Sequence, residues 1–344
     1  MKKFDFAIGN PAYNEDFANS GENGNFAKPI YNHFMDEAYK IADRVEMIHP
    51  ARFLFNAGST PKAWNEKMLN DPHFKVLHYE EDASKIFSNT LIKGGIAITY
   101  HDNNVKFGAI ETFTPYPEVN AIMKKVIQQN GFLSLSSIMD NQTKFDLNAL
   151  YKEHPEYKKV IGSDGKDKRF RNNIFDKIPL FTDNATDASL KVLGVVSNKR
   201  TYKYIPLKYV EKDTENLNKW KTLVVRVNGT GVLGEVLSKP VILGPQEGYT
   251  QTFIGIGAFK TRTEAENCLC YIKTKFVSTL LSVLKITQDN SIETWKYVPL
   301  QDFTASSDID WSKPVAEVDR QLYKKYGLSE EEINFIETHV QEMK

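Results

Sequence analysis

Short apolar runs alternate with amphipathic segments along the first 115 residues of this 344-residue chain. The run Phe4–Ile8 predicts a strand, and the spacing of apolar residues over Ile30–Ala42 predicts an amphipathic helix. Continued alternation is typical of a largely parallel α/β sheet with crossover helices. The further elements predicted in this region are the helix Pro61–Leu69 and the strands Val45–His49, Phe74–Tyr79, Gly95–Tyr100 and Lys106–Thr112.

The pattern changes after residue 115. A helix over Val119–Gln129 and a polar connector precede a β-rich region, residues 151–300, that is punctuated by glycines. Near its end we expect a helix over Thr263–Leu284, with Thr263 as N-cap and Glu266 three residues later. The strands predicted in this region are Val192–Val196, Thr201–Ile205, Thr222–Val227, Gly231–Val236, Pro240–Leu243 and Gln251–Ile256.

Residues 301–344 have a helical pattern and are acidic, with five Lys and Arg against ten Asp and Glu. Ser329 is the expected N-cap of a helix whose first turn holds three glutamates, which suits the helix dipole. An acidic segment is a poor DNA surface, so we expect it to pack on the protein. The sequence therefore predicts four regions, residues 1–115, 116–150, 151–300 and 301–344.

The formal net charge is zero, but residues 151–300 hold 24 Lys and Arg against 16 Asp and Glu. A basic region with aromatic residues among its cations is expected of a protein that contacts phosphates, although an ordinary solvated surface can have the same composition. No apolar stretch approaches the ~20 residues of a membrane span, and no long apolar signal core follows Met1. We predict a cytoplasmic protein without a membrane partner.

Cysteines and histidines give no sign of a metal site. Cys268 and Cys270 are the only cysteines, too close together for an unstrained disulfide and too few for a zinc site. They are expected to be reduced residues of a core or helix, which suits the cytosol. The histidines form no spaced set with carboxylates, so no metal is predicted.

The strongest chemical signal is the tetrapeptide Asn10-Pro11-Ala12-Tyr13, directly behind the first predicted strand. Ligands of open α/β sheets bind beyond the carboxyl ends of strands. The Asn10 amide oxygen can accept hydrogen bonds from an exocyclic amino group, and the Tyr13 ring offers a stacking surface to an extruded base. Asn-Pro is also a common turn signal, but the preceding strand, the Gly- and Asn-rich loop 19–25 and the following helix favour base binding.

This tetrapeptide resembles the Asn-Pro-Pro-Tyr signature of N6-adenine DNA methyltransferases, specifically the Eco57I and TaqI-like group of restriction-modification methylases. The resemblance implies a partial Rossmann-like methyltransferase sheet over residues 1–115, then a helical connector, a β-rich α+β target recognition domain over residues 151–300 and a C-terminal helical tail. The other segments that carry it are Ile30–Met35, His49–Gly58, Ile86–Thr90, Gly94–Ile98, Thr294–Leu300 and Gln321–Leu328.

The resemblance also implies a reaction, transfer of a methyl group from S-adenosylmethionine to an adenine flipped out of double-stranded DNA. Asn10 and the Pro11 carbonyl would accept hydrogen bonds from the adenine N6 amino group, and Tyr13 would replace part of the lost stacking. Phe87 stands where similar enzymes have a phenylalanine beside the flipped adenine. A core phenylalanine that anchors the loop is the alternative.

Two basic clusters are candidates for DNA contact. The first lies on a predicted turn and strand, and the second on a flexible basic loop suited to phosphate binding. A solvated face is the alternative for each. The first cluster comprises Lys199, Arg200, Tyr202 and Lys203, and the second comprises Lys166, Lys168, Arg169 and Arg171.

Two features depart from the family pattern. Ala12 replaces the usual second proline, which keeps the volume small but loosens the loop. Only nine residues precede Asn10, whereas the glycine-containing donor motif of the family comes well before the signature. We therefore expect this chain to lack the donor motif and to be inactive alone, or to need an N-terminal methyltransferase half. A non-catalytic DNA-binding or specificity protein is the alternative.

The segment Gly229–Gly234 matches G-x-G-x-x-G and follows a predicted strand, so it could be the donor site of a circularly permuted methyltransferase. A cofactor loop should open a helix whose N-terminus faces the ligand. Here Glu235–Pro240 leads to another strand instead. We therefore predict a hairpin turn at these glycines.

Overall fold

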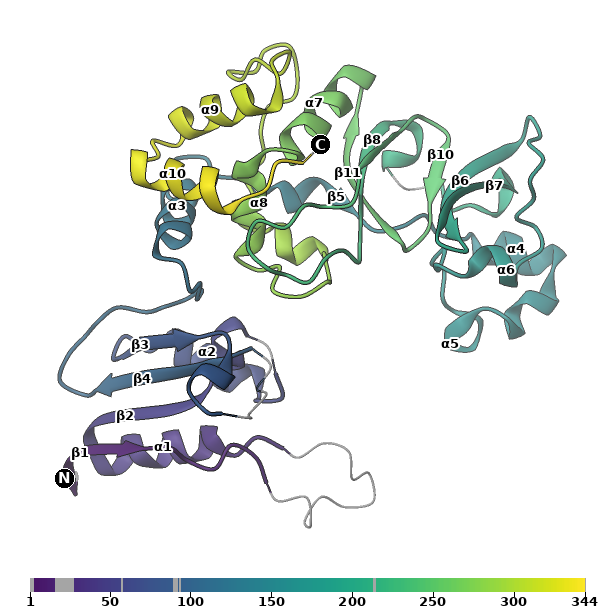
Figure 1. Ribbon diagram of the computed structural model, residues 1–344. Helices are drawn as coiled ribbons and strands as arrows, with labels where there is room; N and C mark the ends of the chain where they lie inside the picture. Colours follow the sequence, from purple (N-terminus) through teal and green to yellow (C-terminus); the bar gives the residue numbers. More distant parts are fainter. Residues whose placement is uncertain are drawn as a thin grey trace. The chain divides into compact units, whose positions relative to one another are not determined.

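The computed structural model describes residues 3–15, 28–56, 58–88, 92, 94–212 and 215–343 of the chain. These residues form two compact units, Met1–Pro117 and Glu118–Lys344 (Figure 1). Both units combine helices with small sheets. The predicted mixture of α and β structure is confirmed, whereas the four-part division of the chain stays a prediction.

A four-stranded sheet in the order β1-β2-β4-β3 organises the first unit. β1 and β2 are parallel and α1 connects them, whereas β4 is antiparallel to both of its neighbours. Three of the four strands, β1, β2 and β3, therefore point the same way, as the predicted largely parallel sheet requires. β4 runs against them, because a loop joins β3 to β4 where a parallel pair would need a crossover connection. The elements are β1 (Phe4–Gly9), α1 (Tyr31–Ile41), β2 (Ala42–Pro50), η2 (Arg52–Phe55), α2 (Lys62–Leu69), β3 (Phe74–Glu80), η3 (Ala83–Lys85) and β4 (Ile96–Asp102).

The segment Lys106–Thr112 is not the strand that its sequence predicts. Gly108 and Glu111 have φ angles of 94° and 58°, which an extended strand does not permit. Its backbone instead bonds to loops, since the Phe107 N–H donates to the Pro72 carbonyl at 2.7 Å. The segment ends by placing Phe113 against the core of the first unit.

The core of the first unit forms where α1 meets the sheet. Tyr31, Met35 and Ala38 recur at helical spacing along α1 and are buried. Val45 and Met47 alternate along β2 and belong to the same cluster. The helical and strand periodicities of the sequence therefore pack against each other, as predicted.

β1 lies at an edge of this sheet, and among the described residues β2 is the strand that pairs with it. Phe4, Phe6 and Ile8 occupy alternate positions on β1 and are 55%, 45% and 74% exposed. On α1, Phe34 is 47% exposed. A sheet edge that carries exposed apolar side chains is a surface that another polypeptide strand can cover.

The second unit holds two sheets, one in the order β10-β6-β7 and one in the order β5-β11-β8-β9. β10 and β6 are parallel, and the other pairs are antiparallel. The strands are β5 (Met139–Asp140), β6 (Ser189–Val196), β7 (Lys199–Pro206), β8 (Trp220–Val225), β9 (Val241–Leu243), β10 (Glu247–Tyr249) and β11 (Phe253–Phe259). The helices are α3 (Pro117–Ile127), α4 (Leu147–Glu153), α5 (Gly162–Gly165), α6 (Ile174–Lys177), α7 (Arg262–Ile272), α8 (Lys275–Ser282), α9 (Val315–Lys325) and α10 (Glu330–His339), with short 3-10 turns η4 (Leu135–Ile138), η5 (Pro155–Lys159), η6 (Leu207–Tyr209), η7 (Glu215–Asn218) and η8 (Ile292–Trp295).

The predicted helix Thr263–Leu284 is two helices, α7 and α8. Thr261 is the N-cap of α7 and accepts a hydrogen bond from the Glu264 N–H at 3.2 Å, so the predicted cap at Thr263 is wrong. Thr274 caps α8 by accepting from the Val277 N–H at 3.2 Å. Threonine competes with the helix for these backbone groups, which explains the break.

The segment Gly229–Gly234 lies in the loop between the antiparallel strands β8 and β9, so the predicted strand Gly231–Val236 is wrong. The Glu235 carboxylate accepts hydrogen bonds from the Thr230 and Gly231 N–H groups at 2.6 and 3.0 Å. A Cβ at Gly234 would collide with the backbone of His339. The glycines allow close packing of this loop, and no helix follows them.

The C-terminal segment packs on the rest of the second unit, as its acidic helical pattern predicts. Ser329 caps α10 in a capping box with Glu332, and Lys125 of α3 forms an ion pair with Glu332 at 2.6 Å. The Asp319 carboxyl of α9 accepts from the Lys275 and Phe276 N–H groups at the start of α8, at 3.0 and 2.9 Å. These contacts fix the last two helices to α3 and α8.

Candidate functional site

One edge of the sheet in the first unit collects the loops that carry the predicted base-binding residues. β1 is parallel to β2, and Pro50 and Glu80 both pair with Ile96. The carboxyl ends of β1, β2 and β3 therefore lie beside the amino end of β4. The loop after β1 contains Asn10, and the loop from β3 to β4 contains Phe87. Because β1 and β4 are two strand positions apart, the loop after β1 starts about 10 Å from the point where the β3–β4 loop ends.

Asn10 follows β1 directly and is exposed. Pro11 is half-buried and Ala12 is exposed. A planar amide held at the carboxyl end of a strand is well placed to accept hydrogen bonds from a ligand beyond the sheet. The structure thus gives Asn10 the position that base binding needs, while its role stays a prediction.

Tyr13 is joined to the start of α1. The Ile30 N–H donates to the Tyr13 carbonyl at 3.0 Å, and Asn14 forms a β-bridge with Pro29. The Tyr13 phenol oxygen is buried and has no hydrogen-bond partner among the described residues, and burial raises the pKa of this phenol. A buried hydroxyl without a partner is unfavourable for stability, and buried polar groups of this kind are often found at functional sites.

Two residues that the sequence analysis did not select lie in this region. The Asn32 amide oxygen on α1 is buried and has no partner among the described residues. Arg52 is exposed at the end of β2, and a Cβ at Gly94 would overlap its side chain. Gly94, which has a positive φ, lets the loop before β4 lie against Arg52, and Gly95 lets it lie against the backbone of Glu80 and Glu81. This contact is visible only in the folded chain, although His49–Gly58 and Gly94–Ile98 are both among the segments that resemble the methylase family.

His49 supports this edge from inside and is structural. Its Nδ1–H donates to the Pro50 carbonyl at 3.1 Å, so its Nε2 accepts from the Thr99 hydroxyl at 2.7 Å. The ring stacks on Tyr31 with centroids 5.6 Å apart. Burial lowers the pKa of His49 to about 4, so the imidazole is neutral at physiological pH.

Phe87 lies in the turn that follows η3. Asp82 caps this turn by accepting from the Ser84 N–H at 3.0 Å, and the Phe87 N–H donates to the Ala83 carbonyl at 2.9 Å. The Phe87 side chain is half-buried. Its loop lies at the same edge as Asn10, while contact of its ring with a base stays a prediction.

The first basic cluster lies on β7, as predicted. Lys199 and Lys203 fall on one face of this strand, whereas Arg200 and Tyr202 fall on the other, because side chains alternate along a strand. The interaction partners of the two faces also differ. On the first face, Lys203 forms an ion pair with Asp183 at 2.6 Å. The Arg200 guanidinium donates to the Lys239 carbonyl and Tyr202 lies under Lys191 with 4.1 Å between its ring centroid and Nζ. The cluster therefore forms two surfaces.

The second basic cluster surrounds a buried carboxylate and is tied down, so the expected flexible loop is wrong. Arg169 donates to Asp167 through Nε at 2.7 Å and Nη2 at 3.0 Å, and Arg171 donates to the same carboxylate. Hydrogen bonds from these arginines hold the Asp167 pKa well below its usual range. Lys168 pairs with Glu211 at 2.8 Å, while Lys166 is exposed. Neutralisation leaves this cluster less charge than its sequence suggests.

Cys268 is buried in α7, where burial raises the pKa of its thiol to about 12, and Cys270 is half-buried; both are free. Within the described ranges, no three His, Cys, Asp or Glu residues come together in a way that could hold a metal ion. In the same part of the chain, no helix is long and apolar enough to cross a membrane.

Comparison with known proteins supports a methylase origin for the N-terminal part. Residues 1–87 match the family model described as Eco57I restriction-modification methylase, which makes this segment a domain of that family and confirms the resemblance there. Among solved structures, the type IIG restriction endonuclease BpuSI matches with 9% identity and a TM-score of 0.33, over 83% of this chain and 43% of that enzyme. The chain thus spans less than half the length of that match. No curated protein sequence matches it.

Proposed function

We propose that this chain supplies the adenine-binding and DNA-recognition parts of a site-specific DNA (adenine-N6)-methyltransferase of a restriction-modification system. One observation carries the proposal. The Asn10-Pro11-Ala12-Tyr13 tetrapeptide follows β1 at the carboxyl edge of the sheet, inside the segment that matches the methylase family.

The acceptor chemistry follows from these residues. The Asn10 amide oxygen and the Pro11 carbonyl accept hydrogen bonds from the N6 amino group of an adenine that has left the DNA stack. These bonds raise electron density on N6 and fix its orientation, so positioning and electrostatics supply most of the rate. Tyr13 and Phe87 stack on the extruded base. The methyl donor of this reaction is S-adenosylmethionine.

The glycine segment Gly229–Gly234 does not fit a donor-binding loop. A Cβ at Gly231 would collide with the backbone of Ile286, and one at Gly234 with that of His339, so packed protein fills the space beside these glycines. The Thr230 and Gly231 N–H groups, which could bind an anion, already donate to Glu235. The proposal therefore gives this chain residues for the acceptor base only.

DNA contact is the role proposed for the second unit. Lys199 and Lys203 offer cations on one face of β7, and Arg200 and Tyr202 offer a cation and a stacking ring on the other. In the second cluster, Lys166 is the cation most available to phosphate, because Lys168, Arg169 and Arg171 are paired with carboxylates.

A second candidate is a non-catalytic DNA-binding or specificity subunit that needs a separate N-terminal methyltransferase half. The exposed apolar edge of β1 favours it. Phe4, Phe6 and Ile8 would be covered if a strand of a partner polypeptide paired with β1. In this candidate the partner holds the methyl donor, and this chain holds the base.

Methylation and binding assays test the proposal and separate the two candidates. The purified chain is incubated with S-adenosylmethionine and unmethylated plasmid DNA, and N6-methyladenine is measured by mass spectrometry; donor binding is measured by calorimetry. Methylation that is lost in Asn10→Ala would eliminate the subunit candidate. Salt-dependent duplex binding without donor binding supports it. A chain that binds neither duplex DNA nor donor would contradict the proposed function.

A further inference from the structure

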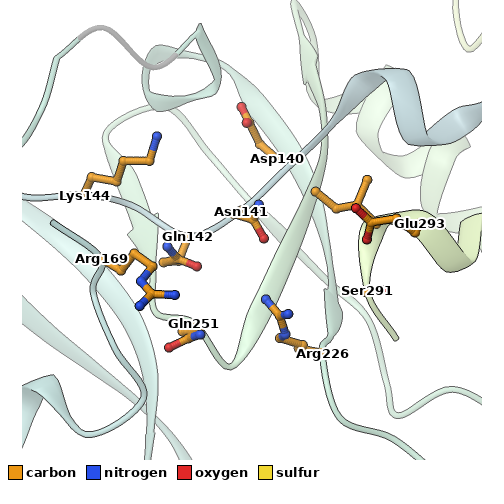
Figure 2. A pocket seen from close by; sticks show the side chains of 10 residues that line it. Asp140, Asn141, Gln142, Lys144, Arg169, Arg226, Gln251, Ser291 and Glu293 are labelled. Atoms are coloured by element: carbon orange, nitrogen blue, oxygen red, sulfur yellow. The ribbon is translucent and has the colours of Figure 1, made fainter. Parts of the chain in front are cut away.

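The second unit contains a polar cavity of about 400 Å³ (Figure 2). It lies where β8 ends and β11 begins, because Arg226 follows β8 and Gln251 precedes β11. Five sequence segments contribute to its wall. The lining residues that matter chemically are Asp140, Gln142, Lys144, Arg226, Gln251 and Glu293.

Main-chain hydrogen bonds fix these segments to one another. The Arg226 N–H donates to the Thr252 carbonyl at 2.9 Å, and the Gln251 N–H donates to the Phe170 carbonyl at 2.7 Å. The Phe170 N–H donates in turn to the Thr143 carbonyl at 3.0 Å. The backbone around the cavity is therefore preorganised, which lowers the entropic cost of binding a ligand.

Several side chains around the cavity have unused hydrogen-bonding capacity. Gln142 is only 3% exposed, yet in the described part of the chain neither its amide nor that of Gln251 forms a hydrogen bond. Arg226 Nε lies 3.8 Å from the Asp289 carboxylate, which is too long for a hydrogen bond. Figure 2 shows these three side chains around the same space. Amides that line a cavity without protein partners are available to a polar ligand.

The kinds of polar group point to base edges. Guanidinium groups only donate, carboxylates only accept, and amides do both. The lining mixes the cations Lys144 and Arg226 with the carboxylates Asp140 and Glu293, so it is not a dedicated anion site. Base edges in DNA present mixed donors and acceptors, which Arg, Gln and acidic side chains distinguish. Arg169 also lines the cavity, but Asp167 occupies its guanidinium.

We propose that Gln142, Gln251 and Arg226 form a base-reading pocket that recognises base edges of double-stranded DNA. This inference rests on the proposed function, in which the second unit contacts DNA. Glutamine pairs best with adenine through N6 and N7, and arginine with guanine through O6 and N7. The recognised sequence should therefore contain purines whose identity depends on these three side chains.

The test is selection from a randomised duplex DNA pool by the full chain, followed by sequencing of the bound fraction. Affinities for the enriched duplex and for a scrambled duplex are then measured by fluorescence anisotropy. The variants are Gln142→Leu, Gln251→Leu and Arg226→Lys. Arg226→Lys keeps the positive charge but loses the planar guanidinium group, which can donate two parallel hydrogen bonds to one base. Gln128→Leu, at an exposed position beyond α3, is the matched control.

Each pocket variant should lose about 10- to 100-fold affinity for the enriched duplex and little for the scrambled one, while Gln128→Leu keeps both. Equal loss on both duplexes would show phosphate contact and overturn the inference, as would unchanged binding. If Gln142→Leu does not fold, judged by circular dichroism, the two less buried positions decide. If the wild-type chain binds no duplex, the proposed function itself fails. This outcome differs from failure of the pocket inference alone, in which the wild-type chain binds DNA but the pocket variants bind it equally well.

Discussion

The two candidate sites of this protein are built in opposite ways. At the sheet edge of the first unit, the residues proposed to bind the base lie in the loops that follow β1 and β3, and Asn10 to Tyr13 form one contiguous run. In the second unit, the cavity takes Gln142, Arg226 and Gln251 from segments far apart in the sequence. A site made by one loop can be recognised as a motif, whereas a site made by several strands is visible only in the folded chain.

The largest expected effect concerns the glycine loop that supports the sheet edge. Gly95 has a φ of 75°, and an added Cβ would lie 2.9 Å from the Glu81 Cα and also collide with the Glu80 carbonyl oxygen. Gly95→Ala should lower the free energy of unfolding of the first unit by about 3–5 kcal/mol. Hydrogen exchange measured by mass spectrometry can follow each unit separately.

Gly108→Ala is the matched control, because Gly108 also has a positive φ of 94° but an added Cβ meets nothing within 4 Å. It should cost only about 1 kcal/mol, the usual penalty of this backbone region. Equal effects of the two substitutions would show that the close approach at Gly95 does not support the edge.

His49 should make the stability of the first unit depend on pH. The unfolded imidazole takes a proton near pH 6.5 and the folded one only near pH 4. Unfolding therefore binds a proton between these values, and the free energy of unfolding falls as the pH drops from about 7 to 4, by up to ~3 kcal/mol. Chemical denaturation over this range, followed by exchange in each unit, measures it.

His49→Gln should flatten this pH dependence, whereas the exposed His33→Gln should leave it unchanged. A pH dependence that survives in His49→Gln would assign the effect to another group.

The two faces of β7 give a smaller effect. Lys199→Ala should weaken duplex binding about tenfold at low salt if its face contacts phosphates, and should reduce the slope of log affinity against log salt by about 1. Lys260→Ala removes an exposed lysine elsewhere in the second unit as a control. Anisotropy titrations at several salt concentrations measure both. Identical slopes for wild type and Lys199→Ala would remove this residue from the DNA surface.

The smallest effect is expected for Tyr13→Phe. The hydroxyl is buried without a partner among the described residues, so its removal should leave stability unchanged or raise it by less than about 1 kcal/mol. Thermal melting of the two proteins gives the difference. A clear loss of stability would mean that the hydroxyl does form an essential bond.

Much of the fold was predictable, since hydrophobic periodicity gave β1, α1, β2, α2, β3 and β4 within a few residues. The reversed direction of β4 was not, because it depends on how β3 and β4 connect in space. The tetrapeptide at Asn10 could be found from the sequence because its functional groups belong to consecutive residues. Counting charges overestimated the net charge of the loop at Arg169 and Arg171, since both donate to the Asp167 carboxylate, which offsets one of their two positive charges. The buried amide of Gln142 has no sequence signal at all.

The central claim is that the loop after β1 holds an extruded adenine. It is tested most directly with the duplex enriched by selection, carrying fluorescent 2-aminopurine next to each adenine in turn, so that the adenine keeps its N6 amino group. At one position the wild-type chain should raise the fluorescence several-fold, because the neighbouring 2-aminopurine loses its stacking partner when the adenine leaves the stack. Asn10→Ala should bind this duplex but lose most of the rise, whereas Asn70→Ala, an exposed asparagine in the same unit, should keep it. Tight binding without a rise at any position, or a rise unaffected by Asn10→Ala, would contradict the account.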